Sequence, residues 1–168
     1  MKAEKQIEKI EVTIDDYTFY CAPFPAMTSA RISGDLSAVL GPVISGILPL
    51  LDAVSGDDES FLDKDFAEVA PALSGAFSAL SGDKVEKLLK ELLIDHRNVS
   101  FNSVNDETVA WLDLSAFNEI FCKDIMGAYR LAFEVIKLNF GDFFTKLTTL
   151  FGSRTDGKAE KTQKITVI

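Results

Sequence analysis

The sequence predicts a mainly α-helical fold, a helical bundle with a short N-terminal β-hairpin and an optional second small hairpin (α+β by strict count). Apolar residues recur at every second position in only two short stretches, whereas most of the chain has them at helical spacing. Proline and glycine divide the helical part into segments. With 168 residues, 47% hydrophobic and 26% charged, the composition is typical of one soluble globular domain.

The first hairpin is predicted for residues 7–21. Apolar side chains alternate with polar ones on either side of the pair Asp15-Asp16, which is the expected turn. Pro23 and Pro25 then end the second strand. Pro25 can also open a helix, because its missing N–H would have no partner in a first helical turn.

Three helices are expected next. The first runs from about Ala26 to Leu40 and ends at Gly41-Pro42. The second covers Val43 to Val54 with a kink at Pro49, and the third follows an acidic loop. Its apolar stripe consists of Phe61, Phe66, Val69, Leu73, Phe77 and Leu80.

A fourth helix is predicted by Asp83 and Glu86, which have the spacing of an N-cap and N3 capping box before a helical run of apolar residues. The stretch from His96 to Trp111 changes to period two around a polar turn, which favours a second hairpin or a pair of extended segments.

A long helix is expected from Ser115, because apolar positions keep the helical period to Leu138 and continue from Phe140 to Phe151. We therefore expect a single mainly helical domain over residues 1–152. Residues 153–168 are expected to form a mobile polar tail, since they contain little apolar surface to offset the entropy of ordering.

The charge balance argues against nucleic acid and membranes as direct partners. The formal net charge is -9 and the sequence pI is near 4.6, so the surface repels phosphate groups. The apolar segment from Ala38 to Leu51 is too short to span a bilayer and contains two prolines. Two distant cysteines and the lack of a signal-peptide pattern favour a cytoplasmic location.

No residue pattern indicates catalysis or a cofactor. His96 is the only histidine, and neither cysteine nor any nearby serine has the context of an activated nucleophile. We expect it to face solvent just after a helix end. Zinc ligands and phosphate-binding loops are missing, and the acidic stretch from Asp57 to Asp65 lacks the glycine and glutamate of a calcium loop. We therefore expect no enzyme activity, no metal and no cofactor.

Two apolar segments, Gly46 to Leu51 and Phe140 to Phe151, are more hydrophobic than one buried helix face requires. One interpretation is that both fill the core. The other is that part of this surface binds an apolar helix of another protein. The candidate partner-binding residues are Phe140, Phe143, Phe144, Leu147 and Phe151. The same surface could equally seal a homodimer, so self-association stays open.

Three strings carry a resemblance to a known family: Tyr17 to Ala26 (YTFYCAPFPA), Leu40 to Pro42 (LGP) and Phe133 to Phe144 (FEVIKLNFGDFF). In these strings and in the order of its elements, most of the chain resembles the tail assembly chaperones of long-tailed bacteriophages.

The resemblance implies a non-enzymatic protein of the bacterial host cytoplasm. It would bind the tape measure protein, a long, apolar and largely helical chain, and keep it soluble until tail-tube subunits polymerise round it. Such a protein would be absent from the mature virion. In this family a longer frameshifted product often exists, branching after a position like Phe151. The alternatives are a structural tail component, such as a completion or connector subunit, and a homo-oligomeric interaction protein.

Overall fold

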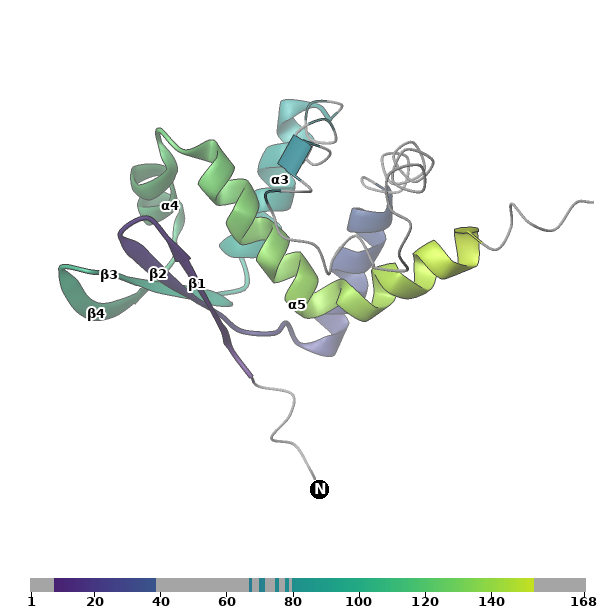
Figure 1. Cartoon of the computed structure of the whole chain (residues 1–168), viewed down its shortest axis with the longest axis horizontal. Helices are drawn as coiled ribbons and strands as arrows, with labels where there is room; N and C mark the ends of the chain where they lie inside the picture. Colours follow the sequence, from purple (N-terminus) through teal and green to yellow (C-terminus); the bar gives the residue numbers. More distant parts are fainter. Residues whose placement is uncertain are drawn as a thin grey trace, which may run out of the picture.

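The protein combines a four-stranded antiparallel sheet with helices, as Figure 1 shows. This computed structural model describes residues 8–38, 67, 70–71, 75, 78 and 80–152, with the backbone alone for 143–152. Residues 26–38 are helical and are called helix 26–38 below. The other elements are β1 (Ile10–Ile14), β2 (Tyr17–Cys21), α3 (Gly82–Leu93), β3 (Val99–Ser103), β4 (Asp106–Trp111), α4 (Leu114–Phe121) and α5 (Ile125–Gly152).

The prediction of a mainly helical bundle is wrong, because the two hairpins form one sheet and the fold is α+β. The strand order is β1-β2-β3-β4, so the second strand of one hairpin pairs with the first strand of the other. The β2–β3 register places Phe19 opposite Phe101. Two-stranded hairpins are marginally stable alone, and the pairing of β2 with β3 joins them into one larger sheet. Period-two alternation predicts strands but does not name their neighbours.

The core lies between one face of this sheet and the helices. Phe19, on the second strand of the sheet, is 0% exposed. Its ring stacks on Phe121 of α4, with centroids 5.7 Å apart and planes 19° apart. It also lies 6.1 Å from the ring of Phe101. These contacts fix the sheet to α4 at the centre of the molecule.

The long helix predicted from Ser115 is divided into α4 and α5. The chain leaves the helix after Phe121 and starts again after Asp124, whose side chain accepts a hydrogen bond of 3.0 Å from the N–H of Gly127. Asp113 caps α4 in the same way, accepting from the N–H of Ala116 at 2.8 Å. Two aspartate caps thus turn one apolar run into two helices that pack in different directions.

The other helices differ from expectation in detail. The predicted capping box is wrong: α3 starts at Gly82, its N-cap is Ser81, and no side-chain cap hydrogen bond forms. Asp83 lies in the first turn, where the helix dipole favours its charge. The first predicted helix is confirmed over 26–38, and the described residues of the third are helical except Leu80. The predicted helix Val43 to Val54 and tail 153–168 lie outside the described residues.

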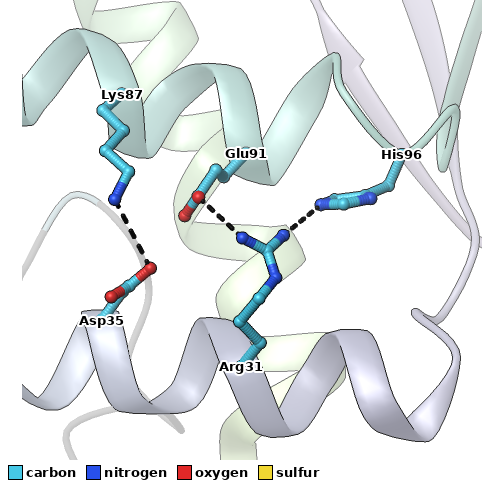
Figure 2. A network of polar contacts seen from close by, with 5 residues as sticks. All are labelled: Arg31, Asp35, Lys87, Glu91 and His96. Atoms are coloured by element: carbon cyan, nitrogen blue, oxygen red, sulfur yellow. Dashed lines mark hydrogen bonds and ion pairs between the residues drawn. The ribbon is translucent and has the colours of Figure 1, made fainter.

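Helix 26–38 is joined to α3 by a row of polar contacts (Figure 2). Arg31 pairs with Glu91 at 3.1 Å and contacts His96 Nε2 at 3.0 Å. One turn further along, Lys87 pairs with Asp35 at 3.7 Å. His96 follows α3 as expected, but it is half-buried and its ring packs edge-on against Phe24.

Gly127→Ala should destabilise the fold, because an added Cβ would collide with the Asp124 carboxylate and lie 3.2 Å from Ile14. We expect a loss of about 1–2 kcal/mol, the worth of an N-cap. Gly141→Ala is the matched control, because Gly141 lies in the same helix and a Cβ added there would have nothing within 4 Å. It should raise stability by about 0.5–1 kcal/mol. Urea unfolding measures both, and equal stability of the two variants would contradict this packing.

The buried thiol of Cys21 should make the free energy of unfolding depend on pH. Burial, with a smaller contribution from the Glu134 carboxylate, raises the pKa of its thiol from 9.0 to about 12. Above pH 9 the unfolded chain therefore loses a proton that the folded chain keeps, and the free energy of unfolding falls by up to about 1.4 kcal/mol per pH unit. Cys21→Ala should lack this slope in urea unfolding between pH 9 and 12. Identical slopes would contradict the burial of the thiol.

Candidate functional site

An open apolar groove lies between α3 and α4, with α5 contributing at its base. It encloses a volume of about 640 Å³. Its apolar residues are Leu80, Val85, Leu89, Ile94, Leu114, Phe117 and Tyr129. Ser78, Gly82, Glu86, Lys90 and Asn118 complete the lining.

The apolar walls of the groove remain accessible in the folded protein. Val85, Ile94, Phe117 and Tyr129 are half-buried, although they pack against the core. Leu114, at the start of α4, is 46% exposed. Because these side chains line the same groove, they are exposed together rather than as scattered residues.

The polar rim carries little net charge of its own. Glu86 and Lys90 lie one turn apart on α3 and form an ion pair. Their hydrogen bond lowers the pKa of Glu86 and raises the pKa of Lys90, so both stay charged over a wide pH range. Asn118 faces the groove from α4. The charges of the rim therefore balance each other and stay hydrated. Burial of the apolar walls would supply most of the binding free energy for a partner.

The position of each wall follows from the core. On the α4 side, Phe117 packs against Phe121 with centroids 5.1 Å apart, and Phe121 in turn stacks on Phe19 of the sheet. On the α3 side, Leu88 and Leu92 are buried in the core and hold the helix in place. Each wall helix thus uses one face for the core and leaves a second apolar face open.

This arrangement can bind apolar side chains but offers no catalytic set. Within the part of the chain that the structure describes, no group of three His, Cys, Asp or Glu residues could hold a metal ion. In the same part, no helix is long and apolar enough to cross a membrane. A groove between two helices suits an amphipathic helix whose apolar residues recur at i, i+3, i+4 and i+7.

The residues predicted for partner binding belong to α5. Phe140 is 3% exposed and packs against Phe24 with ring centroids 6.4 Å apart. Phe143, Phe144, Leu147 and Phe151 belong to the last part of α5, where the side chains lie outside the described residues. The structure therefore places Phe140 in the core of the free protein and leaves the other four as a prediction. The apolar segment Gly46 to Leu51 is also outside the description.

Sequence reasoning missed the groove. Val85 and Leu89 had the spacing of an ordinary buried stripe, and Phe117 was assigned to one long helix. The break after Phe121 separates α4 from α5, and residues of both helices line the groove together with α3. Asp113 and Asp124, each three residues before the N–H that it caps, are the signal that could have indicated this break.

Comparison with known proteins places the chain in a family. A family model described as "Phage tail assembly chaperone protein, TAC" matches residues 15–152. The class of protein is thus a phage assembly factor. The match begins in the turn after β1 and spans β2 to α5, including all the groove helices. Searches of curated proteins and of solved structures found no match.

Because the match covers most of the chain, the protein belongs to the phage tail assembly chaperone family. The resemblance noted from the sequence is confirmed.

Proposed function

We propose that this protein binds an apolar helical part of the phage tape measure protein and keeps it soluble until the tail tube assembles round it. Family membership supports the general role in tail assembly. The observation that carries the finer proposal is the open groove between α3 and α4, whose apolar walls can receive apolar side chains from one face of an amphipathic helix.

The groove would act by covering the client's apolar stripe. Leu114, 46% exposed, would lose its contact with water when a helix occupies the groove. The half-buried Phe117 and Tyr129 would provide broad aromatic contact area. The formal net charge of -9 would keep the complex in solution by repelling other complexes.

The proposed role is non-enzymatic and is carried out in the host cytoplasm, before the virion is complete. The last part of α5, with Phe143, Phe144, Leu147 and Phe151, is proposed as a second surface for the client or for self-association.

Blocking the groove should stop the protein from keeping its client soluble, and should not unfold the protein itself. Gly82 lines the groove and a Cβ there meets nothing within 4 Å, so Gly82→Trp places an indole at the groove mouth. Gly34→Trp is the matched control, because Gly34 is exposed on helix 26–38 and also has nothing within 4 Å. Each variant is co-expressed with the apolar helical part of the tape measure protein encoded beside it, and the soluble fraction is separated by size-exclusion chromatography.

We expect co-elution with a soluble client for the unmodified protein and for Gly34→Trp. For Gly82→Trp we expect at least a tenfold loss of soluble client, corresponding to about 1.4 kcal/mol or more of binding free energy. Far-UV circular dichroism should be the same for all three. An insoluble client with the unmodified protein would refute tape measure binding, and equal rescue by both variants would move the site away from the groove.

A further inference from the structure

We propose that Arg31 is a positioning residue for the groove: it holds α3, the groove wall, from the side opposite the groove. The proposal rests on the proposed function, because it concerns the affinity of the same groove for its client. Arg31 itself does not line the groove. Its effect would be transmitted through Glu91 and His96, which it contacts at the C-terminal end of α3 (Figure 2).

One face of α3 lines the groove, and another face contacts helix 26–38. Val85, Glu86, Leu89 and Lys90 line the groove. Lys87 and Glu91 contact helix 26–38 instead. At 3.6 residues per turn, the centres of these two sets lie about 150° apart round the helix axis. A rotation of α3 that releases one set therefore displaces the other.

Arg31 provides the cation that a buried carboxylate needs. Glu91 is 6% exposed, and its Oε1 accepts a hydrogen bond of 3.1 Å from Arg31 Nη1. Without Arg31 the carboxylate would be buried without a cation, a state that proteins avoid by moving the charge to water. Because Glu91 belongs to α3, such a movement would pull on the end of the helix and change the width of the groove.

The second contact of Arg31 is with His96. Arg31 Nη2 lies 3.0 Å from His96 Nε2, and a guanidinium can only donate, so this nitrogen is the acceptor. The ring of Phe24 packs edge-on against the imidazole.

The same pair of helices offers a matched control. Lys87 and Asp35 also join α3 to helix 26–38, at 3.7 Å, but their side chains are 66% and 45% exposed. An exposed pair contributes little, and either partner is hydrated when the other is removed. Arg31→Met and Lys87→Met thus remove one cation each from one interface, and only the first leaves a buried charge.

The test measures two quantities in the full-length protein. The first is the affinity for a synthetic peptide covering an apolar helix of the tape measure protein, by fluorescence anisotropy. The second needs no client: methyl NMR shifts of Val85 and Ile94, which line the groove, in the free protein. Thermal unfolding confirms that each variant is folded at the temperature of the assay.

For Arg31→Met we expect about a tenfold weaker affinity and displaced groove methyl shifts. The affinity of Arg31→Lys for the peptide should lie between the affinities of Arg31→Met and the unmodified protein. The affinity of Lys87→Met should stay within about twofold of that of the unmodified protein. Adding Glu91→Gln to Arg31→Met removes the buried charge and should restore both readouts, which also covers the case in which the single variant does not fold. Failure of the double variant to restore the methyl shifts would overturn the proposal.

Replacement of His96 gives an independent arm. In His96→Gln, whose side-chain oxygen can accept from Arg31, the groove methyl shifts should stay at their values in the unmodified protein. Unchanged methyl shifts in folded Arg31→Met would overturn the proposal. If those shifts change while no peptide binds the unmodified protein, the positioning role stands and the proposed function fails.

Discussion

The ring stack between Phe19 and Phe121 connects the two halves of this structure. Phe19 lies at the centre of the sheet, and Phe121 ends α4. Phe117, one turn before Phe121, contacts it on one side and the groove on the other. The sheet therefore determines where α4 lies, and α4 determines one wall of the groove. The second wall, α3, is fixed by its own core leucines and by the ion pairs from helix 26–38.

This arrangement explains how an acidic, folded protein can expose an apolar surface without losing its structure. The groove walls are the second faces of helices whose first faces are already buried, so the core does not depend on the groove being filled. Glu86 and Lys90 neutralise each other at the rim, so a partner meets apolar walls beside a compensated ion pair. Membership of the tail assembly chaperone family is consistent with the proposed role of this surface in tail assembly.

Local patterns in the sequence predicted the local structure well. The turn at Asp15-Asp16, both hairpins and the helix ending at Leu93 follow from periodicity and turn residues. The pairing of β2 with β3 joins residues about eighty positions apart, and alternation contains no information on that partner. The groove was missed for the same reason. Val85 and Phe117 each look like core residues of their own helix, and only the three-dimensional arrangement of the helices shows that both line an open space.

The central claim is that the client helix occupies the groove, and site-specific photocrosslinking tests it most directly. A benzophenone amino acid is introduced at Leu114 in the groove, at Phe144 in the last part of α5, and at Met27, which is 83% exposed on helix 26–38. Each protein is irradiated in complex with the apolar part of the tape measure protein. The account predicts crosslinks from position 114 and none from position 27. Crosslinks from position 144 with none from position 114 would contradict it.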